Sequence, residues 1–366
     1  MKIVHVIGSL MLGGAESQVA NLSIEQARRG HQVTIILFDK FDTALERHCA
    51  AHRVELTAVG IKKGSILSGI YRLYSILKKI SDRNTIIQTW MYGADLFVSL
   101  CSIVNFFSGG SQFQIFWNVR STKFTGFVDF SLKRYLIALP CIPLSYVIPR
   151  GIICCAHTAL AEHASWGFDK SKLTVIHNCF NESKFYLKTG RPNDRFTLGF
   201  AGRYDPIKNF PSFVSMVDRL LSKGYEINAH VAGRGYSDTL LTKLGYRSPV
   251  TKVIEFKGQV DHMPVFYHEI DLLLVTSFSE GFPNVICEAI LSGADCLSFD
   301  VGDVSEILPA ENVINDRSTD HMLEKIESRL AGRDNTSREQ LRTRVLEKFD
   351  IKVVTDRYDR VYRSLV

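Results

Sequence analysis

The sequence lacks the paired cysteines that mark disulfide-stapled and zinc-binding proteins. Its eight cysteines stand apart, with no Cys-x-x-Cys pair, at positions 49, 101, 141, 154, 155, 179, 287 and 296. This pattern is typical of reduced thiols in a cytosolic protein. An Asp-x-Asp signature and clusters of His and Asp with ligand spacing are missing as well, so we expect no bound metal ion.

Long uninterrupted apolar runs are also missing. Residues 96–119 carry no charge, but Ser-Gly-Gly-Ser-Gln at 108–112 divides them into a helix and a strand. Residues 135–149 are too few to span a bilayer and include three prolines. We therefore expect no transmembrane helix. The second run lies beside Lys133, Arg134 and Arg150, which leaves two interpretations open: contact with a membrane surface, or burial.

A signal peptide, internal repeats and low-complexity tracts are likewise absent. The first residues, Met-Lys-Ile-Val-His-Val-Ile, enter a strand directly, which together with the cysteines predicts a cytoplasmic protein. The 366 residues are enough for two domains with separate cores. A net charge of +6 suits phosphate-bearing substrates or an anionic membrane surface, and does not call for nucleic acid as a partner.

The chain opens with a strand, a glycine-containing loop, a helix and a second strand. We expect strands at 2–7 and 32–38, with the helix ending near Arg29, which predicts a parallel, doubly wound sheet. The loop glycines are Gly8, Gly13 and Gly14, so the Gly-x-Gly-x-x-Gly spacing of dinucleotide-binding proteins is not met. This spacing argues against an NAD(P)-dependent oxidoreductase.

A second strand-and-helix series starts at Phe196, after a polar segment. The loop that follows this strand contains Arg203 and Lys208, five residues apart. A guanidinium fork and an ammonium at such a position suit a phosphate, although two surface cations are the plain alternative. Further along, Gly233 follows another strand and allows a close approach of the backbone to a ligand.

The most informative stretch is 277–293, Ser-Phe-Ser-Glu-Gly-Phe-Pro-Asn-Val-Ile-Cys-Glu-Ala-Ile-Leu-Ser-Gly. Gly281 permits a tight turn, and Pro283 marks the start of a helix whose first N–H groups have no partner within the helix. Such an end attracts a diphosphate. Glu280 precedes the helix, and Glu288 lies on its surface. These two carboxylates need hydroxyl donors, and a nucleotide sugar offers hydroxyls and a diphosphate together.

At these residues the chain resembles the GT-B retaining glycosyltransferases of family 4. Glu280 and Glu288 are similar to the family's E-x7-E motif, and Arg203 with Lys208 resembles its diphosphate-binding pair. Trp-Met-Tyr-Gly-Ala-Asp at 90–95 and Arg120-Ser resemble a bacterial O-antigen and capsular polysaccharide branch. That branch usually has a histidine where this chain has Gly93, so no histidine role is carried over.

The resemblance implies an α/β protein of GT-B fold, with two Rossmann-like, doubly wound parallel-sheet domains facing a cleft. Residues 1–182 are expected to bind the acceptor and residues 183–348 the nucleotide sugar. Residues 349–366 are expected to form a helix that crosses back to the first domain.

The resemblance also implies the activity. It is retaining transfer of a hexose or N-acetylhexosamine from a nucleotide sugar, preferably UDP-linked, to a lipid-diphosphate-linked oligosaccharide. The product is a bacterial surface polysaccharide made at the inner face of the cytoplasmic membrane, without metal or cofactor. The implied catalytic residues are Glu280, Arg203 and Lys208. The implied donor-binding residues are Gly13, Gly14, Gly202, Gly233, Gly281, Phe282, Asn284, Val285 and Glu288. Asn118 and Arg120 are candidate acceptor or cleft residues.

Two alternatives share this fold. A non-hydrolysing UDP-sugar epimerase binds the donor and converts it without an acceptor. A non-catalytic GT-B subunit binds a partner, but we expect such a subunit to have lost Glu280, Arg203 or Lys208.

Overall fold

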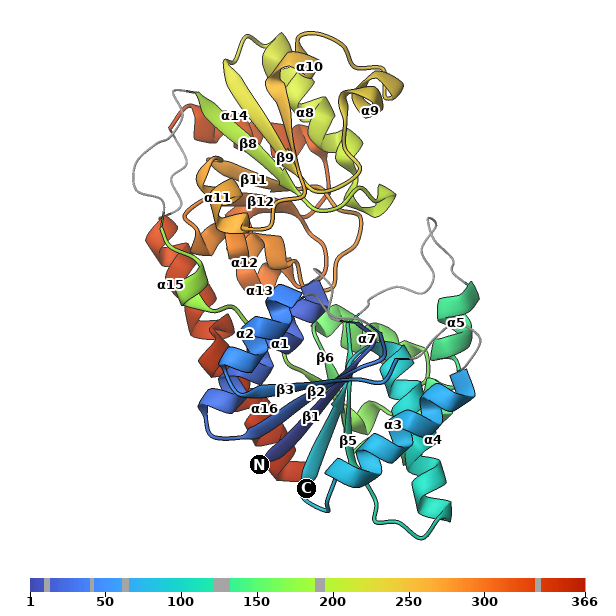
Figure 1. Ribbon diagram of the computed structural model, residues 1–366. Helices are drawn as coiled ribbons and strands as arrows, with labels where there is room; N and C mark the ends of the chain where they lie inside the picture. Colours follow the sequence, from blue (N-terminus) through green and yellow to red (C-terminus); the bar gives the residue numbers. More distant parts are fainter. Residues whose placement is uncertain are drawn as a thin grey trace. The chain divides into compact units, whose positions relative to one another are not determined.

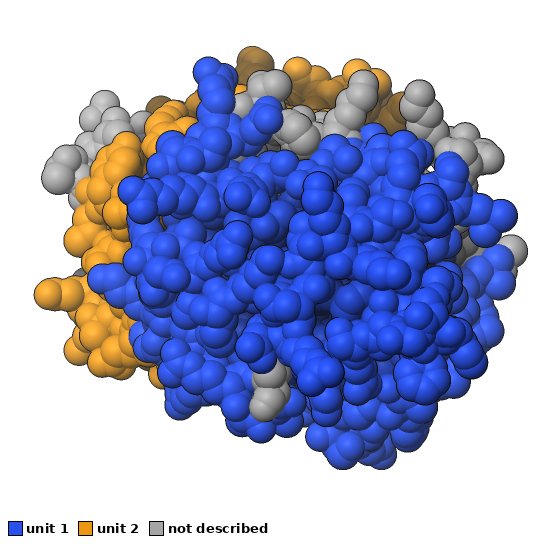
Figure 2. Space-filling view, turned by 60° about the horizontal axis from the view of Figure 1, so that its bottom comes forward, with its two compact units in different colours: residues 1–179, 351–366 blue, residues 180–350 orange. Residues whose placement is uncertain are grey.

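A computed structural model describes residues 1–9, 14–39, 43–60, 66–120, 132–187, 195–332 and 337–365. The chain divides into two compact units, drawn in separate colours in Figure 2. Unit 1 comprises Met1–Cys179 and Ile351–Val366, and unit 2 comprises Phe180–Asp350.

Unit 1 is built on a seven-stranded parallel sheet with the order β3-β2-β1-β4-β5-β6-β7 (Figure 1). The strands are β1 (Lys2–Ile7), β2 (Gln32–Leu37), β3 (Val54–Ala58), β4 (Thr85–Thr89), β5 (Gln114–Val119), β6 (Gly151–Cys154) and β7 (Leu173–Val175). The central strands are buried along nearly their whole length because helices cover both faces. The doubly wound parallel sheet predicted from the sequence is confirmed.

Helices cover the two faces of this sheet in separate groups (Figure 1). One face carries α1 (Gly14–Arg28), α2 (Thr43–Ala51) and α16 (Ile351–Leu365). The other carries α3 (Ile66–Ile80), α4 (Met91–Phe107), α6 (Cys141–Val147) and α7 (His157–Ser165), with α5 (Leu132–Ala138) packed on α4. A 3-10 turn, Lys170–Lys172, precedes β7.

The apolar run 96–119 divides as the sequence predicts. Helix α4 ends at Phe107, Gly109 turns the chain with a φ of 73°, and β5 begins at Gln114. Within the described ranges, no helix is long and apolar enough to cross a membrane.

A buried polar network joins β1 to the start of α4. Trp90 Nε1–H donates to His5 Nδ1 over 3.0 Å, so His5 donates through Nε2 to Gln26 Oε1 over 2.7 Å. Burial lowers the pKa of His5 to about 4, and the ring is neutral. The indole of Trp90 is thereby held in one orientation.

Unit 2 contains a six-stranded parallel sheet with the order β10-β9-β8-β11-β12-β13. The strands are β8 (Phe196–Ala201), β9 (Ile227–Ala232), β10 (Ile254–Gly258), β11 (Leu272–Val275), β12 (Asp295–Phe299) and β13 (Val313–Ile314). The α-helices are α8 (Phe210–Ser222), α9 (Asp238–Lys243), α10 (Val250–Val253), α11 (Met263–His268), α12 (Asn284–Leu291), α13 (Val304–Ile307), α14 (Thr319–Leu330) and α15 (Arg338–Phe349). Helix α8 packs with α10 and α14, and α12 packs with α11 and α15.

Candidate functional site

Two loops meet at the carboxyl ends of the neighbouring strands β8 and β11 in unit 2. One is 202–209, which includes the 3-10 turn Pro206–Lys208, and the other is 276–283. Phe278 N–H donates to the Ile207 carbonyl oxygen over 2.7 Å, and the Thr276 hydroxyl contacts the Lys208 and Asn209 carbonyl oxygens at 3.1 and 3.0 Å. The carboxyl edge of a parallel sheet is where open α/β folds place ligands.

The two loops bring Lys208 and Glu280 together. Lys208 Nζ lies 2.7 Å from Glu280 Oε1, and the two side chains are 22% and 14% exposed. The Ser277 hydroxyl donates to the same carboxylate oxygen over 2.6 Å. Sequence reasoning missed Ser277, although its position three residues before Glu280 in a turn was a usable signal.

Arg203 is also in the first loop, but its side chain is 74% exposed. Its Nη2 atom lies 3.5 Å from Asp205 Oδ2, while its carbonyl oxygen accepts a hydrogen bond from the Tyr236 hydroxyl over 3.1 Å. The backbone of Arg203 is therefore anchored, and its guanidinium extends from the loop.

Glycines let four loops crowd together at this edge. Gly233, after β9, has a φ of 136°, and a Cβ atom there would lie 1.8 Å from the Gly202 carbonyl oxygen. Gly302, after β12, has a φ of 57°, and a Cβ atom would lie 2.3 Å from the Gly281 carbonyl oxygen. Because both contacts are with backbone, no side chain is tolerated at Gly233 or Gly302.

Helix α12 begins beside Glu280 with an end that no side chain caps. Pro283 precedes the helix, and its half-buried first residues are Asn284 and Val285. The ring of the intervening Phe282 turns into the core of unit 2, where it packs against Phe349 with ring centroids 5.0 Å apart. Phe282 thus offers a ligand its backbone and not its ring.

Glu288 lies one turn into α12. The Tyr267 hydroxyl, from α11, donates to Glu288 Oε2 over 2.8 Å. Desolvation by the surrounding side chains raises the pKa of Glu288, and the bond from Tyr267 opposes that rise. Sequence reasoning missed Tyr267, since nothing in the spacing of 21 residues indicates the contact.

The predicted residues of unit 1 occupy different environments. Asn118 is fully buried in β5, and its side-chain amide donates to the Tyr358 hydroxyl of α16 over 2.8 Å. Arg120 is half-buried, stacks 4.4 Å above the Trp90 ring and donates to the side-chain oxygen of Asn178. Gly14 is the exposed first residue of α1. Gly13 lies outside the described residues.

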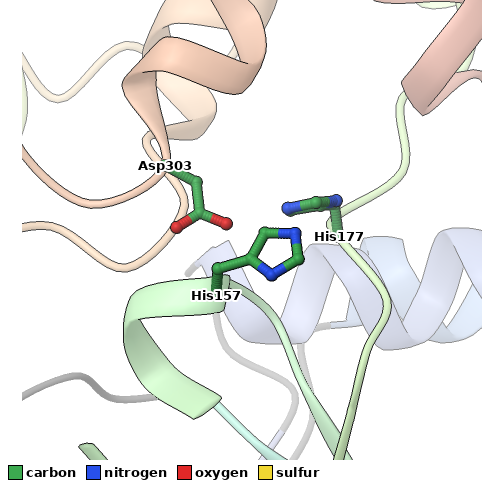
Figure 3. A group of neighbouring side chains, drawn as sticks. All are labelled: His157, His177 and Asp303. Carbon is green, nitrogen blue, oxygen red and sulfur yellow. The ribbon is translucent and has the colours of Figure 1, made fainter. Parts of the chain in front are cut away.

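Two histidines of unit 1 also lie side by side (Figure 3). His157, at the start of α7, and His177, after β7, have ring centroids 5.5 Å apart in an edge-to-face arrangement. Asp303, also drawn in Figure 3, belongs to unit 2 and precedes α13. Over the described ranges, neither unit by itself brings three His, Cys, Asp or Glu side chains within reach of one metal ion.

Comparison with known proteins matches each unit to a model of a glycosyltransferase domain. Residues 12–184 match the model described as Glycosyltransferase Family 4, and residues 195–331 match Glycosyl transferases group 1. Among solved structures, Anabaena HepE in complex with UDP-glucose superposes with a TM-score of 0.79 at 16% identity, over 100% of both chains. The predicted GT-B fold is confirmed.

The curated relatives are longer than the part of them that this protein matches. One chain of the human phosphatidylinositol N-acetylglucosaminyltransferase is 23% identical over 83% of this protein and 62% of its own length. The capsular polysaccharide biosynthesis glycosyltransferase CapM of Staphylococcus aureus is 23% identical over 57% of this protein and 56% of its own length. The protein thus spans less than two thirds of either relative.

Proposed function

We propose that this protein is a retaining glycosyltransferase that moves a hexose or N-acetylhexosamine from a nucleotide sugar to an acceptor hydroxyl. The observation that carries the proposal is the meeting of Lys208 and Glu280, 72 residues apart, beside the uncapped start of α12. A cation, a carboxylate and a helix N-terminus match the diphosphate and the hydroxyls of one ligand.

The roles follow from the chemistry of each group. Lys208 and the first N–H groups of α12 stabilise the charge that develops on the departing diphosphate. The exposed guanidinium of Arg203 has room to turn toward the same phosphates. Glu288 accepts hydrogen bonds from the ribose hydroxyls, and Glu280 accepts them from the sugar beside its anomeric carbon. Backbone at Gly202, Gly233 and Gly281 lies close to the donor.

Retention is proposed to occur by displacement on one face of the sugar. The acceptor oxygen bonds to the anomeric carbon as the bond to the phosphate oxygen breaks, and that phosphate oxygen takes the acceptor's proton. Lys208, Arg203 and the helix end supply the positive charge, so the reaction proceeds without a metal ion. Gly13 and Gly14 are proposed to bind the donor, and Arg120 is proposed for the acceptor side, whereas Asn118 is fully buried and bound to Tyr358.

The choice of donor and acceptor draws on the relatives. HepE was solved in complex with UDP-glucose, which supports a UDP-sugar donor. The names of CapM and of the human transferase specify a capsular polysaccharide and a phosphatidylinositol. We propose a lipid-diphosphate-linked oligosaccharide of a bacterial O-antigen or capsule as the acceptor.

An acceptor of this kind places the protein at the cytoplasmic face of a membrane, and exposed apolar side chains on two helices of unit 1 suit such contact. Leu67 and Tyr71 on α3 and Phe106 and Phe107 on α4 are each at least 70% exposed. Helices α3 to α6 pack in sequence and contain one acidic residue, Asp95, which is fully buried. Exposed aromatic side chains favour a lipid interface, and the shortage of acidic residues within these helices favours an anionic one.

Titration calorimetry of the full chain with a panel of UDP- and GDP-sugars tests the donor proposal. We expect one nucleotide sugar to bind in EDTA and Lys208→Ala to weaken it by about 10- to 100-fold, because a charge-assisted contact is lost. Failure of every nucleotide sugar to bind would contradict the proposal. Conversion of the donor to its epimer without an acceptor would favour the epimerase alternative.

A further inference from the structure

The groups assigned to the two halves of the donor are bound to each other. Lys208, assigned to the diphosphate, and Glu280, assigned to the sugar, form an ion pair 2.7 Å long. The two side chains are 22% and 14% exposed, so both charges are largely shielded from water. An unpaired charge is most costly in such a buried site.

The carboxylate of Glu280 is held in place by its own loop. The Ser277 hydroxyl donates to Glu280 Oε1 over 2.6 Å. Arg317 Nη1 donates to the Phe278 carbonyl oxygen over 3.3 Å, and Phe278 N–H is bound to Ile207. A ligand that takes Lys208 therefore leaves Glu280 where it is, close to the incoming phosphates.

A free nucleoside diphosphate and a nucleotide sugar meet this arrangement differently. The free diphosphate draws Lys208 toward itself and leaves the Glu280 carboxylate beside two phosphates without the positive charge of Lys208, so that like charges repel. The nucleotide sugar brings hydroxyl groups that donate to Glu280 in place of Lys208.

We propose that the Lys208–Glu280 ion pair selects nucleoside diphosphates that still carry their sugar over free nucleoside diphosphate. The inference rests on the proposed function and adds a selectivity to the same site. It also assigns the pair a part in turnover: once the sugar has left, Glu280 takes back Lys208, and release of the diphosphate is favoured.

Glu280→Gln tests the proposal because it removes the negative charge and keeps the size of the side chain. The probes are the nucleotide sugar that binds wild type most tightly and its own nucleoside diphosphate, titrated in EDTA. We expect Glu280→Gln to tighten binding of the free diphosphate by about tenfold, which corresponds to about 1.4 kcal/mol. Binding of the nucleotide sugar does not tighten, so the preference for it falls.

Glu327→Gln is the matched control. Glu327 pairs with Lys223 at 2.5 Å between α14 and α8 of the same unit, so this variant makes the same change in net charge on another ion pair. We expect its affinities to equal those of wild type.

The outcomes separate this inference from the proposed function. If wild type binds a nucleotide sugar but Glu280→Gln binds the free diphosphate no more tightly, the selectivity proposal is wrong and the donor site stands. Equal tightening by Glu327→Gln would also overturn it, as an effect of net charge. If wild type binds neither probe, the proposed function itself fails.

Discussion

A hydrogen bond from Tyr267 opposes the effect of burial on the ionisation of Glu288. The Tyr267 hydroxyl lies 2.8 Å from Glu288 Oε2, and burial raises the pKa of this carboxyl. A donor to a carboxylate stabilises the charged form, so Tyr267 favours the ionised carboxylate that the proposed contact with the ribose hydroxyls needs.

We predict that Tyr267→Phe weakens donor binding more at pH 6 than at pH 8. Loss of the hydroxyl raises the pKa of Glu288 further, and the protonated carboxyl accepts fewer hydrogen bonds. Calorimetry at the two pH values measures the effect. Tyr362→Phe is the control, because that buried hydroxyl bonds to Gln88 in unit 1 over 3.0 Å. A loss of affinity that is the same at both pH values would contradict the prediction.

Asp95 is a second carboxyl group whose pKa is shifted by burial. It is fully buried near the start of α4, and the Thr89 hydroxyl donates to its Oδ1 atom over 2.5 Å. Burial raises its pKa well above the ordinary 3.8, so the folded protein keeps a proton that the unfolded chain has lost. Its contribution to stability is therefore greatest at low pH and declines as pH rises above that ordinary value.

We predict that in Asp95→Asn the free energy of unfolding falls less as pH rises, because the amide does not ionise. Its oxygen still accepts a hydrogen bond from Thr89. Melting temperatures between pH 5 and pH 8 measure the slope, and we expect the loss of stability over this range to be greater in wild type than in the variant by about 1 kcal/mol or more. Asp261→Asn, at an exposed position, is the control. Equal slopes in wild type and Asp95→Asn would contradict the prediction.

Secondary-structure elements with strong local patterns were predictable from sequence. The bounds expected for β1 and those observed agree, because a run of Ile and Val follows the first charge and Gly8 ends it. The split of 96–119 at its glycines was predictable for the same reason. Strand β3 and helix α2 were not identified, since Val54–Ala58 contains Glu55 and is half-exposed at the sheet edge.

Long-range contacts of the site were less predictable. The resemblance placed Lys208 and Glu280 in one site, but not in one ion pair, because the pair depends on how the loops after β8 and β11 pack. Asn118 was expected at a cleft, whereas the structure buries it against Tyr358, 240 residues away. No spacing rule covers such a contact.

At the scale of helices, the exposed aromatic end of α4 makes a prediction about membranes. Phe106 and Phe107 are 71% and 82% exposed at the end of α4, so their replacement leaves the core of unit 1 intact. We predict that the Phe106→Ser, Phe107→Ser double variant loses binding to vesicles containing phosphatidylglycerol, because two aromatic anchors are removed.

Sedimentation with vesicles measures this binding, and neutral phosphatidylcholine vesicles serve as the lipid control. Val265→Ser, at an exposed apolar position on α11 of unit 2, is the matched protein control. Wild-type binding that equals that of the double variant would contradict the proposed membrane contact.

The fold of unit 1 depends on the C-terminal helix α16, which returns to it after unit 2. After unit 2 ends at Asp350, helix α16 buries Ile351, Val354, Tyr358 and Tyr362 in the core of unit 1. Each side chain of this size is worth roughly 1.5–3 kcal/mol when fully buried. Unit 1 is therefore made of two segments that lie far apart in sequence, and unit 2 of one continuous segment.

We predict that residues 180–350 fold when expressed alone, because unit 2 has its own core. Residues 1–179 alone are expected to remain unfolded or to aggregate, and addition of a peptide of residues 351–366 is expected to restore a cooperative thermal transition. Circular dichroism measures all three. A cooperative transition of 1–179 without the peptide, at the same temperature as with it, would contradict this account.

The most direct test of the central claim is detection of the transferred sugar. Mass spectrometry would follow the full chain with UDP- and GDP-sugars and a synthetic lipid-diphosphate sugar in EDTA. The account predicts that the acceptor gains the mass of one sugar, and that Lys208→Ala and Glu280→Ala each abolish the gain. No gain from any donor, or an undiminished gain in both variants, would contradict it.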